Sequence, residues 1–483
     1  MKVGNFLKKI TIEKKIFFFI LIFFPILVFG VTDTNNIFEN DYDEGVNLMR
    51  AYMVNEGFSL YKEIWMCQPP VLVLTLSCLF KFLGPSALVA RLLVLAFSLL
   101  IVVTLFEIIN STLDLPAALC GIILLILSSF FVKMSVSVME LIPAVGFIML
   151  TIYCLIRYEK EFNRNYIVFS GIFFAMAVLT RIFSLLFLPA VIIGVALLKK
   201  KKGPTTNNPD YCSNLFLWLI IFLVFLFLMS YITAVDPGQI FYTHILARKQ
   251  GFYGKENIFI WLLEEWDIIM LAVGIQFLPR AKRRFLIMPL IAFLVPSLIF
   301  YFYTPRWYHH RVWVIIPLCW LAAFGFYALF RLRSKPGNKK RLVQVFFIIV
   351  LVSTIVRIPF KFVRMKSPQS SRINHQKDAL AFEIIRKYVS PGSSILTDRP
   401  IVPFYLNLPV HPNFATVTRK RMFTGLLTAE DFIRIIQKQK PDLIFFARFP
   451  ELAEKLTPFI IQNGYESKSE KALNPSRLFV LKK

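Results

Sequence analysis

The sequence has few cysteines and lacks the short motifs that mark common soluble enzymes. Its six cysteines are scattered, no C-x-x-C pair occurs, and none lies after residue 360. A disulfide framework or a structural zinc site is therefore not expected. There is also no P-loop, G-x-G-x-x-G, H-E-x-x-H or G-x-S-x-G motif. Nucleotide binding by a glycine-rich loop and the zinc-protease and serine-hydrolase mechanisms are therefore not indicated.

Charged residues are scarce and apolar residues are abundant. The chain of 483 residues is 17% charged and 57% hydrophobic, with a mean hydropathy of +0.63. Soluble domains contain roughly 45–50% apolar residues. The apolar residues here form blocks of about 16–22, which is long enough to cross a hydrocarbon core of about 30 Å. The sequence therefore predicts an α-helical polytopic membrane protein.

Acidic residues are outnumbered, and the formal net charge is +26. In a soluble protein such a charge would suggest nucleic-acid binding. Here Lys and Arg occur in short runs between the apolar blocks, as in cytoplasmic loops under the positive-inside rule. We therefore expect no nucleic acid among the partners.

Eleven membrane-spanning helices are predicted. Their approximate bounds are 16–31, 88–109, 115–132, 141–156, 166–180, 182–198, 215–234, 258–278, 285–303, 312–330 and 342–360. A cytoplasmic N-terminus places the basic runs inside, including Lys199 to Lys202 and Arg331 to Arg341. The expected location is the plasma (inner) membrane, with the C-terminal domain extracytoplasmic.

The apolar block from Pro69 to Gly84 is not counted as a span. It has 16 residues, starts with Pro69-Pro70 and contains Lys81. Counting it would invert every later loop, so we interpret it as a juxtamembrane or re-entrant helix. The first outer loop then covers residues 32–87. It holds a second amphipathic helix with Val46, Met49 and Met53 on one face, and such helices usually lie in the membrane interface.

Residues 1–364 are expected to form the transmembrane domain, and residues 365–483 a small extracytoplasmic domain. In the second region, Ala379 to Tyr388 and Ala429 to Gln439 have the pattern of amphipathic helices. Short strands are predicted at 394–397, 442–446 and 477–481. Alternating helices and strands predict a small α/β domain.

Candidate functional residues gather at the predicted outer ends of the spans. The segment Asn40-Asp41-Tyr42-Asp43-Glu44-Gly45 places three carboxylates within four residues. Such carboxylates can bind a divalent cation such as Mg²⁺ or Mn²⁺, or supply a general base. A solvated acidic loop is the alternative. Asp41 and Asp43 are the candidate metal ligands.

A second acidic residue and several cations lie on the same side. Glu140 begins the fourth span, and Arg181 separates two apolar runs. Glu140 can be an interfacial end group, and Arg181 either reaches the headgroups or binds an anion. The segment 303–311 holds four cationic or aromatic candidates: Arg306, His309, His310 and Arg311. It is either an interfacial aromatic belt or a phosphate clamp.

Carboxylates and cations on one face suit the transfer of a group from a lipid phosphate. A base activates the acceptor, and positive charge holds the departing phosphate. No strong general acid is needed, because phosphate is stable as an anion.

A family resemblance joins these residues. Asp43-Glu44-Gly45, then Gln68-Pro69-Pro70, then Gly84-Pro85-Ser86 and Arg91 resemble the start of GT-C membrane glycosyltransferases. The relevant superfamily contains the protein mannosyltransferases and the aminoarabinose transferases. The superfamily has a D-E pair after the first span, which resembles Asp43-Glu44, and a second acidic residue, which resembles Glu140. Its L-T-K pattern resembles Leu179-Thr180-Arg181. Its H/R-Y-x-x-P pattern resembles His309-His310-Arg311 before Pro317.

The resemblance implies a role for each residue. Asp43 would be the base or a metal-linked carboxylate, with Glu44 supporting it and Glu140 as the second acidic group. Arg181 and the segment from His309 to Arg311, with Arg306, would bind the lipid phosphate. Gln68 would also contact substrate. It stands where the aminoarabinose enzymes have Lys, so the aminoarabinose donor is not favoured.

We therefore expect an inverting glycosyltransferase that uses a polyprenyl-phosphate-linked sugar. Its acceptor would be a glycolipid, a polysaccharide or a protein; a protein acceptor is less favoured because no large luminal insertion is present. No cofactor beyond Mg²⁺ or Mn²⁺ is expected. The alternatives are a polytopic transporter or lipid flippase, a membrane-anchored binding protein, and an oligosaccharide ligase of another fold. A transporter predicts charges and broken helices near the bilayer midplane.

Overall fold

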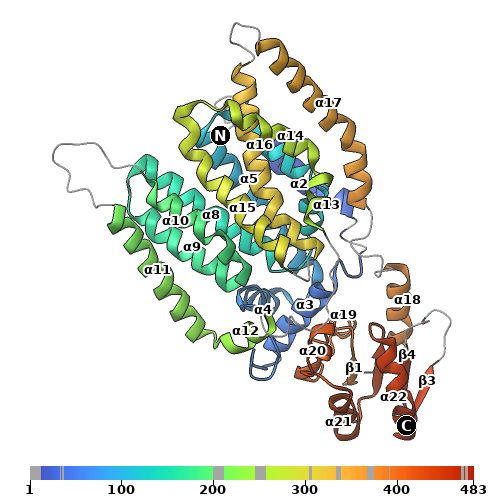
Figure 1. The fold of residues 1–483 in the computed structure, drawn as a ribbon. Coiled ribbons are helices and arrows are strands. Elements are labelled where there is room, and N and C mark those ends of the chain that lie inside the picture. Colours follow the sequence, from blue (N-terminus) through green and yellow to red (C-terminus); the bar gives the residue numbers. More distant parts are fainter. Residues whose placement is uncertain are drawn as a thin grey trace, which may run out of the picture.

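A computed structural model describes most of the chain. The described residues are 12–32, 34, 37–198, 211–244, 257–303, 307–332, 339–366, 375–390, 392–468, 473 and 477–482. The predicted basic run Lys199 to Lys202 lies outside them. The elements form a helical bundle followed by a smaller part in which helices and strands mix (Figure 1).

The bundle is built from helices of very different length. In chain order they are α2 (Ile12–Thr32), α3 (Tyr42–Asn55), α4 (Val71–Leu83), α5 (Ala87–Thr112), α6 (Leu115–Ile126), α7 (Ser129–Met134), α8 (Leu141–Glu161), α9 (Asn165–Thr180), η1 (Ile182–Phe187), α10 (Leu188–Ala196), α11 (Tyr211–Ile232), α12 (Pro237–His244), α13 (Ile258–Glu264), α14 (Trp266–Val273), η3 (Gly274–Phe277), η4 (Arg280–Lys282), α15 (Arg283–Phe302), η5 (Tyr308–Arg311), α16 (Val312–Leu332) and α17 (Lys339–Lys366).

Each of the eleven predicted spans coincides with a helix or with a run of consecutive helical segments. Among the described residues, seven helices are long and apolar enough to cross a membrane. The other four spans correspond to the shorter apolar helices Leu115–Ile126, Asn165–Thr180, Ile182–Ala196 and Trp266–Phe277. The helical membrane fold is therefore confirmed. Val71–Leu83 is also a short apolar helix, and its juxtamembrane or re-entrant placement stays a prediction.

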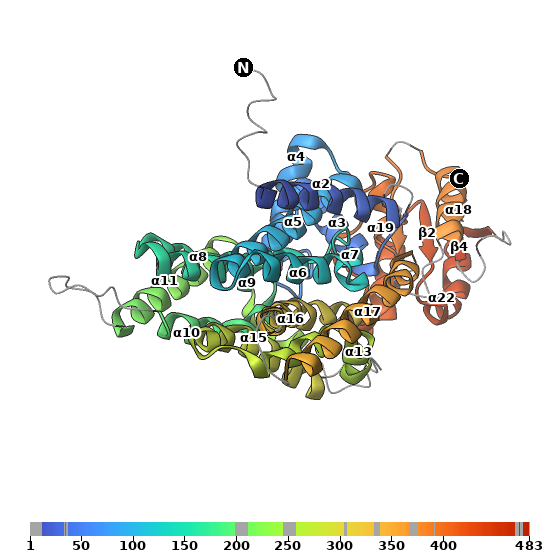
Figure 2. The same ribbon diagram turned by 90° about the horizontal axis from the view of Figure 1, so that it is seen from above.

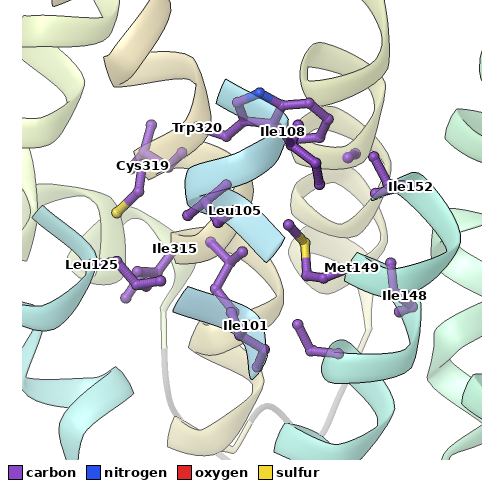
Figure 3. Packing of buried hydrophobic residues seen from close by; sticks show 14 of the residues in the cluster. Ile101, Leu105, Ile108, Leu125, Ile148, Met149, Ile152, Ile315, Cys319 and Trp320 are labelled. Atoms are coloured by element: carbon purple, nitrogen blue, oxygen red, sulfur yellow. The ribbon is translucent and has the colours of Figure 1, made fainter. Parts of the chain in front are cut away.

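The core of the bundle is formed by the faces of α5, α6, α8 and α16. Figure 3 shows Ile101 and Leu105 of α5 between Met149 of α8 and Ile315 of α16. α16 is buried along almost its whole length, whereas α11 and α17 expose rows of apolar side chains. In Figure 1 these two helices lie on opposite edges of the bundle. Such exposure suits contact with lipid, since a lipid tail is as apolar as leucine.

Two glycines let α14, η3 and α16 approach closely. A Cβ atom added to Gly325 would lie 1.9 Å from the backbone oxygen of Leu271. A Cβ atom added to Gly274 would lie 2.7 Å from the backbone oxygen of Gly325. Small residues at such crossings are typical of helix packing in membranes, where close backbone contact replaces the hydrophobic effect.

Several helix ends meet at the end of the bundle away from α3. Lys282 Nζ donates to the Thr112 backbone oxygen at 2.6 Å. Asn214 Nδ2 donates to the Tyr158 hydroxyl at 2.8 Å, and Arg331 pairs with Asp114 at 3.9 Å. These contacts join helix ends that the predicted alternation of spans places on one side. We call the opposite end, which carries α3 and α4, the α3 end.

The C-terminal part packs against the α3 end (Figures 1 and 2). It consists of α18 (His375–Arg386), β1 (Ile395–Thr397), α19 (Ile401–Tyr405), η6 (Pro412–Phe414), α20 (Arg419–Phe423), α21 (Ala429–Gln439), β2 (Leu443–Phe446), α22 (Pro450–Gln462), β3 (Tyr465–Lys468) and β4 (Arg477–Leu481).

Its four strands form one sheet in the order β1-β2-β4-β3. β1 and β2 are parallel, with Leu396 opposite Ile444, and β4 is antiparallel to β2 and β3. The prediction of a small C-terminal region with strands is confirmed. β3 and α22 were not predicted; β3 reads Tyr-Glu-Ser-Lys and buries just its first residue, so it carries almost no apolar signal.

The α14–α16 crossing gives a testable consequence. We expect Gly325→Ala to lower the free energy of unfolding by about 1–3 kcal/mol, because overpacking forces the backbones apart. Gly30→Ala is the matched control, since a Cβ atom at Gly30 of α2 has no heavy atom within 4 Å. Thermal unfolding of the purified variants in detergent measures the difference. Equal Tm values for the two variants would contradict the close approach.

Candidate active site

The start of α3 fixes the two aspartates of the acidic segment. Asp41 caps the helix, and its Oδ1 accepts a hydrogen bond from the Asp43 backbone N–H at 2.9 Å. Position 45 is a glycine, and the close packing explains why: a Cβ atom there would lie 2.5 Å from Glu39 Oε1 and 2.8 Å from Ile401 Cβ. The D-E-G sequence thus combines a helix cap with a point of close approach to α19. Asp43 stays partly exposed.

Glu44 is fully buried in an ion pair with Arg91 of α5. Arg91 Nε lies 2.8 Å from Glu44 Oε1 and its Nη2 lies 3.2 Å from Oε2. Arg91 Nη1 also donates to the Thr34 backbone oxygen at 2.8 Å, and the Asn40 N–H donates to Glu44 at 2.5 Å. Both carboxylate oxygens are therefore engaged. This arrangement fits a positioning role for Glu44, since it anchors the segment before Asp43.

Glu140, Arg181 and His309 come together from three different spans. Glu140 precedes α8, and Arg181 has an extended backbone between α9 and η1. Arg181 Nη1 lies 3.6 Å from Glu140 Oε2, and its Nη2 lies 3.1 Å from His309 Nε2. All three side chains are at most 6% exposed. The structure therefore brings together three residues that are remote in sequence.

The short helix η5 contacts four different regions with four consecutive residues. The Tyr308 hydroxyl donates to Asp41 Oδ2 at 2.8 Å, and His309 contacts Arg181. His310 stacks on Phe300 with ring centroids 4.7 Å apart. Arg311 pairs with Glu264 and lies 4.0 Å over the Phe130 ring. Arg311 is thus directed toward α13 rather than toward Arg181, and Arg306 lies outside the described residues.

A second group of charges surrounds the break between α13 and α14. Lys361 Nζ lies 2.9 Å from Asp267 Oδ2 and 3.1 Å from Glu265 Oε2. The other members are Glu264, Arg311, Arg357 and Arg364, which join by further ion pairs. No motif in the sequence predicted this network. Its acidic residues interrupt an apolar run, and that interruption was the available signal.

Asp43 shares its surroundings with the Glu140–Arg181 pair. Burial raises the pKa of Asp43 to about 7, and the carboxylates of Asp41 and Glu140 act in the same direction. The cations Arg448 and Arg181 act against them. A carboxyl group with such a pKa can accept and release a proton near neutral pH. Perturbed groups of this kind are concentrated at functional sites.

The C-terminal part supplies a residue that the sequence analysis missed. The Arg448 guanidinium lies 3.2 Å from the centroid of the Tyr42 ring, beside Asp43. Three backbone N–H groups, of Ala447, Arg448 and Phe449, donate to the buried Asp398 carboxylate at 2.8–2.9 Å. Asp398 therefore holds the turn after β2 in the shape that presents Arg448 to α3. No sequence motif marks this contact.

Metal binding by these residues is limited by existing hydrogen bonds. Both Asp41 oxygens already accept hydrogen bonds, from the Asp43 N–H and the Tyr308 hydroxyl. Within the described part of the chain, no group of three or more His, Cys, Asp or Glu side chains is arranged to hold a metal ion. Asp43 and Asp41 alone would give two protein ligands.

Gln68 lies at the edge of the same region. Its side chain is 9% exposed, and its backbone oxygen accepts a hydrogen bond from the Tyr61 hydroxyl at 2.9 Å. The following prolines lead into α4, which has Pro70 as its N-cap. Gln68 is therefore held by its backbone, and its side-chain Oε1 has no hydrogen-bond partner among the described residues.

Comparison with known proteins bears on the fold. Residues 67–229 match the model of a family described as dolichyl-phosphate-mannose-protein mannosyltransferase. No curated protein sequence matches the chain. The crystal structure of ArnT from Cupriavidus metallidurans bound to undecaprenyl phosphate is similar, with a TM-score of 0.66 and 14% identity. The match covers 97% of this chain and 98% of ArnT.

The chain has the GT-C fold. A second solved structure, AglB from Archaeoglobus fulgidus with an inhibitory peptide and a dolichol-phosphate, gives a TM-score of 0.57 at 11% identity. That match covers 96% of this chain and 74% of AglB. The predicted resemblance to GT-C membrane glycosyltransferases is thereby confirmed at the level of the fold, which is that of an integral membrane protein. The roles of the individual residues remain predictions.

The Glu44–Arg91 pair gives a second prediction. Glu44→Gln leaves the Arg91 charge buried without its partner, so we expect a loss of about 3–5 kcal/mol in the free energy of unfolding. The double variant Glu44→Gln/Arg91→Met should recover part of that loss. Glu161→Gln is the matched control, because the Arg157–Glu161 pair is 35% and 41% exposed and such pairs contribute about 0–1 kcal/mol.

Thermal unfolding in detergent provides the measurement for all three variants. Similar Tm values for Glu44→Gln and Glu161→Gln would contradict the anchoring role of Glu44.

Proposed function

We propose that the protein is an inverting glycosyltransferase that takes a sugar from a polyprenyl-phosphate carrier. The observation that carries the proposal is the shared site of Asp43 and the Glu140–Arg181 pair on a GT-C fold. The partly exposed carboxylate of Asp43 can act as a base, and the buried guanidinium of Arg181 can bind an anion. These are the two functions that transfer from a lipid phosphate requires.

The proposed reaction is a single displacement. Asp43 accepts the proton of the acceptor hydroxyl while the oxygen of that hydroxyl forms a bond to the anomeric carbon of the sugar. The bond from that carbon to the phosphate oxygen breaks on the opposite face, so the configuration inverts. Arg181 stabilises the departing polyprenyl phosphate, and a charge-assisted hydrogen bond from Arg to phosphate is strong.

The other site residues support these two. Glu140 holds Arg181 in place through the 3.6 Å contact, and His309 contacts the same guanidinium at 3.1 Å. Glu44 fixes the loop through Arg91. His310 is packed among aromatic rings and orients η5. Arg311 pairs with Glu264, so we assign it a structural role rather than phosphate binding.

The metal requirement belongs to this proposal. Asp41 and Asp43 could hold Mg²⁺ or Mn²⁺, with the remaining ligands supplied by water and the substrate phosphate. Such an ion would neutralise charge on the departing phosphate.

The carrier and the orientation are proposed from the comparisons and the charge pattern. ArnT is described with undecaprenyl phosphate and AglB with a dolichol-phosphate, which supports a polyprenyl phosphate as carrier. The acceptor is a glycolipid, polysaccharide or protein. The basic loops support a cytoplasmic N-terminus, so the α3 end faces the outside of the plasma (inner) membrane. The residue pattern does not identify the sugar.

The deciding experiment is sugar release from radiolabelled undecaprenyl-phosphate sugars by purified protein in detergent. We expect Asp43→Asn to lower turnover at least about 100-fold, since general-base catalysis contributes about 10²–10⁴-fold. Glu56→Gln is the matched control, because Glu56 is an exposed carboxylate at the other end of α3. Its turnover should equal that of the unmodified protein.

Adding EDTA, Mg²⁺ or Mn²⁺ tests the metal separately. Loss of turnover in EDTA and recovery with either ion supports a metal at Asp41 and Asp43. Equal turnover of Asp43→Asn and the unmodified protein would remove Asp43 from the mechanism. Movement of labelled lipid across vesicles without sugar release would instead support the transporter alternative.

A further inference from the structure

The helix α12 docks on the segment that precedes the two prolines of α4. The Met66 backbone N–H donates to Gln239 Oε1 at 2.9 Å, and His244 Nε2 lies 2.9 Å from the Cys67 backbone oxygen. Met66 and Cys67 are thus hydrogen-bonded to residues near the two ends of α12. This contact places His244 next to the residue that precedes Gln68.

The hydrogen bond to Cys67 fixes the tautomer of His244. A backbone carbonyl can only accept, so Nε2 carries the proton that it donates. Burial lowers the pKa of His244 to about 4, and the charges of Lys420 and Arg181 also lower it. The ring is therefore neutral near pH 7, and Nδ1 is a hydrogen-bond acceptor. It is buried and has no hydrogen-bond partner among the described residues.

Gln68 provides a second acceptor of the same kind. Its Oε1 atom is buried and also has no hydrogen-bond partner in the described part of the chain. Buried polar atoms are almost always paired, because an unpaired one costs about 1–3 kcal/mol. Two such acceptors on neighbouring elements therefore indicate a ligand that brings hydrogen-bond donors.

Aromatic contacts connect these acceptors to the candidate active site. The centroid of the Phe183 ring lies 5.7 Å from that of the His244 ring and 5.4 Å from that of the His310 ring. The Arg181 guanidinium carbon lies 6.0 Å from the centre of the same ring. His244 therefore borders the place where Arg181 would hold the lipid phosphate, and Gln68 directly follows Cys67, the residue to which His244 is hydrogen-bonded.

The chemistry of the two acceptors excludes some ligands. A phosphate offers acceptors of its own, so it cannot satisfy Gln68 Oε1 and His244 Nδ1. An ammonium group offers donors, but beside His244 it would meet the positive charges of Lys420 and Arg181. Hydroxyl groups are neutral donors and meet both conditions.

We propose that Gln68 and His244 form a subsite for the hydroxyl groups of a neutral sugar on the polyprenyl-phosphate donor. The inference rests on the proposed function, and it specifies the sugar as uncharged rather than amino-substituted. Each residue accepts a hydrogen bond from a ring hydroxyl while Arg181 binds the phosphate. A site that pairs with hydroxyls rejects ligands that lack them, because its buried acceptors then stay unpaired.

The test measures binding to the full-length protein in detergent. The probes are undecaprenyl phosphate alone and the same lipid carrying mannose, glucose, arabinose or 4-amino-4-deoxyarabinose. Apparent Kd values come from ligand-dependent thermal stabilisation. We expect at least one neutral sugar lipid to bind about tenfold or more tightly than the bare lipid, and more tightly than the amino-sugar lipid.

Two substitutions locate the gain in affinity. Gln68→Met and His244→Phe each remove an acceptor at similar size, so each should abolish most of the advantage of the sugar while keeping affinity for the bare lipid. Asn214→Leu is the matched control. Asn214 Oδ1 is also a buried atom without a partner among the described residues, but it lies at the opposite end of the bundle.

The outcomes separate the two proposals. The subsite is refuted if the bare lipid binds but no neutral sugar adds affinity. Preference for the amino sugar, or an advantage retained in both variants, also refutes it. If neither the bare lipid nor any sugar lipid stabilises the protein, the donor site itself is wrong, and the proposed function and the subsite fail together.

Discussion

The ion pair between Glu44 and Arg91 is the interaction on which the rest of the site depends. It joins the first turn of α3 to the first turns of α5, inside a region that excludes water. Taking two charges out of water is costly, and the cost is recovered only when the geometry and the additional hydrogen bonds are good. Here Thr34 and Asn40 complete the pair. Asp43 can therefore remain partly exposed on a segment whose neighbours are fixed.

The helix η5 extends that order across the α3 end. Its four side chains reach the Asp41 cap, the Arg181 guanidinium, an aromatic cluster and the charge network of α13, α14 and α17. A shift of α17 would therefore change the position of residues that face Asp41 and Arg181. The network of Glu264 and Asp267 is thus best understood as support for the site and not as a second one.

The sequence was sufficient for features that depend on local pattern. The spans follow from apolar length, and α21 follows from its amphipathic repeat; in the structure this helix also begins with a Thr428–Asp431 capping box. The acidic segment was found for the same reason, because its carboxylates are adjacent. Arg311 shows the limit: its charge was visible, but its partner Glu264 lies on another span. Arg448 could not be found, because its contact with Tyr42 depends on the packing of two remote parts of the chain.

The contact between Tyr42 and the C-terminal part has a consequence for biosynthesis. The Tyr42 hydroxyl donates to the Val417 backbone oxygen, 375 residues later in the chain. Arg50 likewise depends on Thr416. While the chain is being translated and inserted, Tyr42 and Arg50 lack these partners until residues 416–417 have emerged. The candidate active site thus gains these contacts only after the helices of the bundle have been synthesised, and a nascent chain that stops before residue 416 holds those helices without them.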